Sequence, residues 1–163
     1  MDFLMLFVTL GTNDKSFVRL LDAVEACIKD GTIQEEVVVQ AGYTKFSSSL
    51  MRVEASYPQD EFEALLKEAR IIITHGGVGT IMTALKLHKP IIGVARLAKY
   101  QEHVNDHQIQ LLESFEKEGY LIYVKDLEEL GEAIKKAKDF TPAMYKSNTN
   151  ALIAYIEDWI SSH

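Results

Sequence analysis

Short apolar runs alternate with segments of helical periodicity along the chain. The clearest run is Ile-Ile-Ile-Thr at 71–74, which is apolar at consecutive positions, as expected for a strand covered on both faces. The run from Phe3 to Thr9 has the same character, and 36–40 contains three consecutive valines. We therefore predict six strands, over 3–9, 36–40, 50–54, 71–74, 91–94 and 120–124.

Between these strands, apolar residues recur at spacings of three and four, which is the period of one face of a helix. The first such stripe begins at Phe17 and ends before Gly31, and Asn13 and Asp14 precede it as candidate N-capping residues. A second helix is expected to open at Pro58. Further helices are predicted after Thr80 and over about 103–118, 127–138 and 142–160.

Strands that alternate with helices imply βαβ units, and hence a parallel sheet with helices on both faces. The chain has 163 residues, which is the size of one domain and enough to bury a core. No linker or internal repeat divides it, and 42–49 is expected to be a loop beside the sheet. We predict a single doubly wound, Rossmann-like α/β domain over residues 1–163.

Charge and cysteine usage narrow the range of partners. Lys and Arg number 17 against 24 Asp and Glu, a formal net charge of −7, which disfavours binding to nucleic acid or to anionic lipid. The apolar N-terminal run is short and carries Asp2 in place of a basic flank, so it predicts no signal peptide or membrane span. The single Cys27 forms no internal disulfide and is expected to pack inertly on the first helix. A cytoplasmic location is the expectation.

Ligands of such a sheet bind at the carboxyl ends of its strands, so the loops there are the places to search. Two segments qualify, 9–13 after the first strand and 75–80 between a strand and a helix. The second contains three glycines and a threonine, namely Gly76, Gly77, Gly79 and Thr80. Glycines let the backbone approach a ligand closely, and a helix amino end offers free N–H groups and partial positive charge. This combination suits a diphosphate, although the alternative is a tight turn that binds nothing.

The histidines differ in what they suggest. His75 directly follows a strand and would either orient a phosphate or sugar hydroxyl or cap the turn. It is also the internal candidate for a general base. His103 and His107 lie four apart on a predicted helix, with Asp106 between them, but no third ligand at metal-binding spacing accompanies them. Surface histidines are therefore the preferred interpretation, and we predict no metal site and no cofactor.

Three motifs, in this order, resemble the C-terminal, donor-binding domain of glycosyltransferase family 28. They are Ile-Ile-Ile-Thr-His-Gly-Gly-Val-Gly-Thr at 71–80, Ile-Met-x-x-Leu-x-Leu-x-Lys-Pro-Ile-Ile at 81–92 and Glu-His-x-Asn-Asp-His-Gln at 102–108. The opening Val-Thr-Leu-Gly-Thr at 8–12 is similar to the start of a stand-alone version of that domain, the soluble subunit of two-component transferases. The resemblance implies one half of a GT-B architecture.

The resemblance also implies roles for individual residues. It places the diphosphate of a UDP-sugar at Gly76, Gly77, Gly79 and Thr80. It places the donor sugar at Asp106 and Gln108, with Asn105 and His107 flanking them, and turns Gly11 and Thr12 toward the interdomain cleft. It further implies an inverting enzyme that needs no metal. One departure concerns Thr83, which stands where family members often carry a glutamate that binds the ribose hydroxyls.

The leading hypothesis is a transferase subunit that binds UDP-GlcNAc, UDP-Gal or UDP-Glc and donates the hexose to a lipid-linked saccharide. A membrane-attached, acceptor-binding partner subunit would complete it and hold it at the membrane. Of the two branches that the resemblance covers, bacterial exopolysaccharide and capsule assembly is favoured over the dolichol-linked pathway of eukaryotes. The alternatives are a non-catalytic, nucleotide-binding regulatory module and an oxidoreductase domain, although the latter's dinucleotide fingerprint is missing.

The end of the chain offers a candidate contact for that partner. An apolar stripe at helical spacing consists of Leu152, Tyr155, Ile156, Trp159 and Ile160. Such a stripe either packs on the domain's own sheet or leaves Trp159 available as an anchor at an interface, where tryptophan is enriched.

Overall fold

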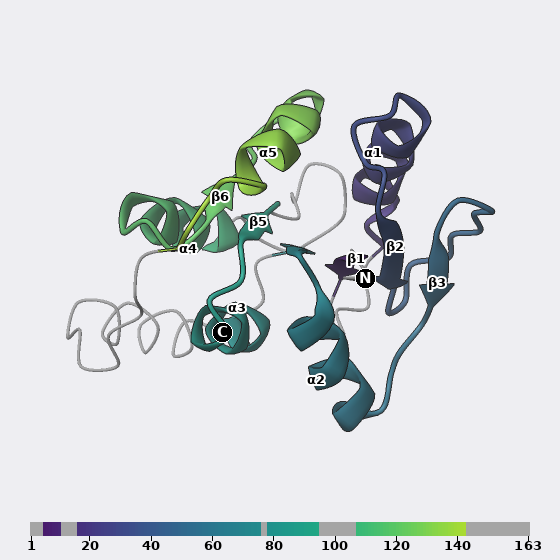
Figure 1. Cartoon of the computed structure of the whole chain (residues 1–163), viewed down its shortest axis with the longest axis horizontal. Helices are drawn as coiled ribbons and strands as arrows, with labels where there is room; N and C mark the ends of the chain where they lie inside the picture. The colour runs from purple at the N-terminus through teal and green to yellow at the C-terminus, as the bar shows by residue number, and fades with distance from the viewer. Residues whose placement is uncertain (1–4, 11–15, 76–77, 95–106, 143–163) are drawn as a thin grey trace.

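The computed structural model describes residues 5–10, 16–75, 78–94 and 107–142. They form one parallel sheet in the order β3-β2-β1-β4-β5-β6 (Figure 1). The strands are β1 (Met5–Thr9), β2 (Glu36–Gln40), β3 (Arg52–Glu54), β4 (Ile71–Thr74), β5 (Ile91–Gly93) and β6 (Ile122–Tyr123). The helices are α1 (Val18–Lys29), α2 (Gln59–Glu68), α3 (Val78–Lys86), α4 (His107–Lys117) and α5 (Leu130–Ala137). The predicted doubly wound fold is confirmed.

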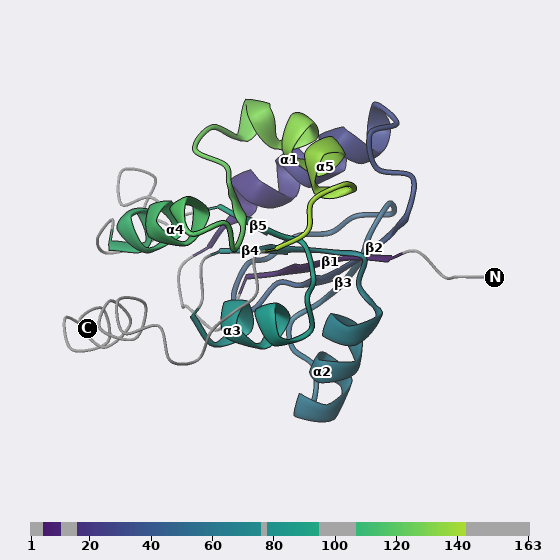
Figure 2. The ribbon, with the colours of Figure 1, turned by 60° about the vertical axis from the view of Figure 1, so that its left-hand side comes forward.

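Two apolar cores lie on opposite faces of the sheet. Figure 2 shows α1 and α5 on one face and α2 and α3 on the other. Leu6 and Val8 of β1 pack in the core with α1 and α5, whereas Met5 and Phe7 pack in the core with α2, α3 and α4. Successive side chains of a strand point to opposite faces, so both sets must be apolar. This is why the predicted strands appear as continuous apolar runs.

The start of α1 differs from the prediction. The helix begins at Val18 with Phe17 as its N-cap, and no side chain caps it, so the prediction that Asn13 or Asp14 caps the helix is wrong. The backbone N–H of Phe17 instead donates to Oγ1 of Thr44, 2.9 Å away, in the loop that follows β2. A partner from a distant loop therefore takes the place of a local cap.

The helix predicted over 127–138 is divided in two. A 3₁₀ turn at Leu127–Glu129 precedes α5, because the Asp126 carboxylate accepts a hydrogen bond from the Glu128 N–H and closes a local turn. The strands β3, β5 and β6 are also shorter than predicted. The helix predicted over 142–160, which carries Trp159, lies outside the described residues.

Cys27 occupies the place expected of it on α1. Its side chain is buried against the sheet, and burial, together with the charge of Asp30, raises the pKa of its thiol. A protonated, buried thiol is a poor nucleophile, which agrees with a packing role.

Candidate functional site

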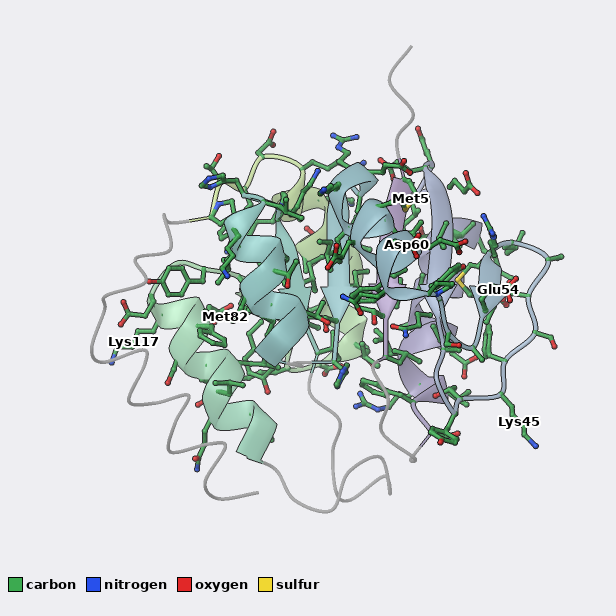
Figure 3. The ribbon with its side chains drawn as sticks, turned by 90° about the horizontal axis from the view of Figure 1, so that it is seen from below. Met5, Lys45, Glu54, Asp60, Met82 and Lys117 are labelled. Carbon is green, nitrogen blue, oxygen red and sulfur yellow. The ribbon has the colours of Figure 1, made fainter. Side chains whose placement is uncertain are left out.

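The amino ends of α1, α3 and α4 lie at the carboxyl edge of the sheet, because each helix follows one of the strands β1, β4 and β5. In Figure 3, Met5 at the start of β1 lies at the top, and Lys45, in the loop after β2, lies toward the bottom. The carboxyl edge therefore faces down in that view, and α4 rises from it toward Lys117. The strands β1, β4 and β5, which precede these three helices, are adjacent at the centre of the sheet.

Acidic residues are distributed unevenly over the helix amino ends. The first turns of α1, α3 and α4 contain no Asp or Glu, whereas α2 has Asp60 and Glu61 there and α5 has Glu132. The amino end of a helix carries partial positive charge, which acidic side chains usually compensate. Within these first turns, the described residues of the three central helices thus supply no carboxylate to compensate the charge.

Gly79 and Thr80 lie in the first turn of α3, which begins at Val78. Gly79 is exposed, and a Cβ atom built on it meets nothing within 4 Å among the described residues. Its backbone is not in the left-handed region that would require glycine. A glycine inside a helix is about 0.5–1 kcal/mol less favourable than alanine. Among the described residues, neither a steric contact nor the backbone conformation requires glycine at this position.

Thr83 lies one turn further along α3. Its hydroxyl donates to the carbonyl oxygen of Gly79, 3.0 Å away. The hydroxyl is thus bonded within the helix itself. A short side chain bonded in this way offers no substitute for the ribose-binding glutamate that the family resemblance leads one to expect at this position.

A row of polar side chains crosses the carboxyl edge of the sheet. Thr9 is paired in register with Gln40 on one side and with Thr74 on the other. All three are buried, and the Thr9 hydroxyl donates to Oε1 of Gln40, 2.5 Å away. His75, which follows Thr74, is buried as well, with 9% of its surface exposed.

Sequence reasoning missed Gln40 and Thr74. The available signal was the last residue of each strand, because three strands with apolar interiors, Met-Leu-Phe-Val-Thr, Glu-Val-Val-Val-Gln and Ile-Ile-Ile-Thr, all end on a polar residue. Only the register shows that these three ends are neighbours.

The structure brings together part of the predicted site. His75, Gly79 and Thr80 lie at the carboxyl end of β4, and His107 and Gln108 are the first two residues of α4, which follows the neighbouring strand β5. The other candidates lie outside the described residues: Gly11, Thr12, Gly76, Gly77, His103, Asn105 and Asp106. Within the described ranges, no group of three His, Cys, Asp or Glu side chains could hold a metal ion.

The family model described as the glycosyltransferase family 28 C-terminal domain matches residues 5–160. The chain belongs to this family. Its fold also resembles solved glycosyltransferases: an NMR structure of ALG13 aligns with 93% of this chain and 94% of its own length (TM-score 0.59, 16% identity). The calicheamicin glycosyltransferase CalG4 aligns over 99% of this chain but 39% of its own length (TM-score 0.64, 17% identity). The family 28 domain therefore has the fold of one half of a GT-B enzyme.

Among curated proteins, the UDP-N-acetylglucosamine transferase subunit ALG13 of Mus musculus is 28% identical over 126 residues. That match covers 72% of this chain and 10% of the mouse protein, so the family 28 chain corresponds to a small part of its relative. In the part of the chain that the structure describes, no helix is both long and apolar enough to cross a membrane.

Proposed function

We propose that this family 28 chain binds a UDP-hexose at the amino end of α3 and acts as the donor-binding subunit of a two-component glycosyltransferase. The observation that carries the proposal is Gly79, an exposed helical glycine for which no described residue makes glycine necessary, beside Thr80. Membership of the family supplies the class of ligand.

The chemistry of such a site follows from its donors. The first N–H groups of α3 have no partner within the helix, and with the Thr80 hydroxyl they would donate to the oxygens of the diphosphate. As the bond from the sugar to UDP breaks, negative charge grows on those oxygens, and donors already in place stabilise it. We propose that this lets UDP leave without a metal ion while the acceptor hydroxyl attacks from the opposite face of the sugar.

The attacking hydroxyl also needs a base. His75 is the candidate within this chain, since it lies at the end of β4 beside α3. The partner subunit is the other source of a base. A His75→Gln variant that binds donor normally but has lost transfer would assign the role to His75, and one that retains transfer would assign it to the partner.

The choice of donor, acceptor and partner rests on the resemblance and on the relatives. The mouse relative is named as a UDP-N-acetylglucosamine transferase subunit, which supports UDP-GlcNAc as the first donor to test, ahead of UDP-Gal and UDP-Glc. That relative is a subunit, which supports a second component; that this component is membrane-attached and binds a lipid-linked saccharide is supported by the sequence resemblance. The chain would then be peripheral to the membrane on its cytoplasmic side. A role in bacterial exopolysaccharide or capsule assembly is supported by the sequence resemblance alone.

Calorimetric titration of the chain with UDP, UDP-GlcNAc, UDP-Gal, UDP-Glc and NAD tests the proposal. We expect saturable binding of UDP and of at least one UDP-hexose, and none of NAD. Binding of NAD without binding of any uridine nucleotide would overturn the proposal in favour of an oxidoreductase domain.

A further inference from the structure

Thr74, the last residue of β4, carries a hydroxyl group for which the fold supplies no partner. Its side chain is fully buried, and its Oγ1 has no hydrogen-bond partner in the part of the chain that the structure describes. A buried hydroxyl without a partner destabilises the folded state. Valine has nearly the same shape and would fill the position without that cost. The position therefore holds a hydroxyl that folding alone does not favour.

Thr9, on the neighbouring strand β1, provides a comparison for the hydroxyl of Thr74. It is paired in register with Thr74 and is equally buried, yet its hydroxyl donates to Oε1 of Gln40. Two adjacent threonines at the same edge of the sheet thus differ in one respect. The hydroxyl of Thr9 is satisfied within the fold, and the hydroxyl of Thr74 is not.

Strand alternation places Thr74 on the same face of the sheet as α3. Side chains two residues apart on a strand point to the same face, and Ile72 packs in one core with Ile81 of α3. Thr74 is two residues nearer the carboxyl edge than Ile72, and the first turn of α3 precedes Ile81. The hydroxyl therefore lies on the face of the sheet that α3 covers, toward the first turn of α3, whose N–H groups have no partner within the helix.

We propose that Thr74 is a further binding residue for the donor, and that its hydroxyl donates a hydrogen bond to a phosphate oxygen of the nucleoside diphosphate. This inference rests on the proposed function, and it adds a buried donor from the sheet to those of α3. Because no described residue pairs with the hydroxyl, binding of the anion would supply its partner.

Three variants test this inference: Thr74→Val, Thr74→Ser and Thr9→Val. Without ligand, Thr74→Val should leave the midpoint of thermal unfolding unchanged or raise it. Thr9→Val should lower the midpoint, because Oε1 of Gln40 loses its donor. In calorimetric titration with UDP, Thr74→Val should bind about tenfold more weakly than wild type, as expected for a lost hydrogen bond to a charged group. Thr74→Ser, which keeps the hydroxyl, should bind as wild type does.

Wild-type affinity for UDP in Thr74→Val would overturn the inference and leave the proposed function standing. A midpoint lowered as far in Thr74→Val as in Thr9→Val would also overturn it, since the hydroxyl would then have a partner in the unliganded fold. If the wild-type chain itself fails to bind UDP, the proposed function falls, and this inference falls with it.

Discussion

At the scale of single residues, substitution of Gly79 should have opposite effects on folding stability and on UDP binding. Replacing it with alanine puts a methyl group where no described atom lies within 4 Å. We expect Gly79→Ala to raise the free energy of unfolding by about 0.5–1 kcal/mol, because alanine favours the helix. The same methyl group should weaken UDP binding about tenfold, as overpacking against a ligand does. Urea denaturation and calorimetric titration measure the two effects.

Gly131 provides a matched control for this variant. It is the second residue of α5, as Gly79 is of α3, and a Cβ atom built on it meets its nearest neighbours at an ordinary 3.9 Å. Gly131→Ala should therefore stabilise the fold without changing UDP affinity. Equal UDP affinity in both alanine variants would contradict a role for Gly79 in donor binding.

The candidate site could be predicted only in part from single residues. The motif at 71–80 pointed to Gly79 and Thr80, because glycines before a helix have a recognisable spacing. Thr74 and Gln40 gave no such signal, since one polar residue at the end of a strand is common. They are neighbours only through the register that pairs Thr9 with both of them. Register is a property of the folded sheet.

At the scale of elements, Gly93 is the point where β5 packs closely against a side chain of α4. Gly93 ends β5, and a Cβ atom built on it would lie 2.5 Å from Cδ2 of Leu112, a fully buried residue of α4. Gly93→Ala should therefore displace α4 and lower the free energy of unfolding by about 1–3 kcal/mol. Because His107 and Gln108 begin α4, affinity for UDP-GlcNAc should fall as well. Urea denaturation and calorimetric titration again provide the measurements.

A second substitution tests whether contact with Leu112 causes the loss of stability in Gly93→Ala. Leu112→Val removes the Cδ atoms that the new methyl group would meet. In the Gly93→Ala background it should recover part of the lost stability, although it is destabilising alone. If the two substitutions act independently, their changes in the free energy of unfolding add. A double variant no more stable than that sum would contradict the proposed contact between Gly93→Ala and Leu112.

Hydrophobic periodicity predicted the existence and order of the described elements. It did not predict the contacts at the ends of α1 and α5, which involve residues distant in the sequence. The start of α1 depends on the Thr44 hydroxyl, 27 positions from Phe17. The end of α5 lies beside Glu35, a buried carboxylate that also pairs with Arg70 at 3.2 Å, and the nitrogen of Lys138 is 3.9 Å from the same oxygen. Local propensity carries no information about partners so distant in sequence.

At the scale of the whole molecule, the described residues are built around one parallel sheet, and a transferase must hold a donor and an acceptor together. We predict that the purified chain binds UDP-GlcNAc but transfers little or no sugar to a lipid-linked saccharide. Adding membranes that contain the acceptor-binding partner should restore transfer, measured as labelled sugar in the lipid fraction. Efficient transfer by the isolated chain would contradict the two-subunit arrangement. Donor binding without transfer, even with the partner present, would favour a regulatory module.

The contact with the partner is predicted from the sequence alone, because Trp159 lies outside the described residues. Trp159→Ala should weaken the restoration of transfer by membranes more than it weakens UDP-GlcNAc binding. Equal losses in the two assays would place Trp159 in the packing of the domain itself.

Nuclear magnetic resonance mapping of UDP-GlcNAc binding on the ¹⁵N-labelled chain tests the proposed donor site most directly. We predict saturable shifts of backbone amides centred on 75–80, with further shifts at the amino ends of α1 and α4. Amides at the opposite edge of the sheet, around Glu35 and Arg70, should not move. Absence of any saturable shift, or shifts centred on that opposite edge, would contradict a donor site at the amino end of α3.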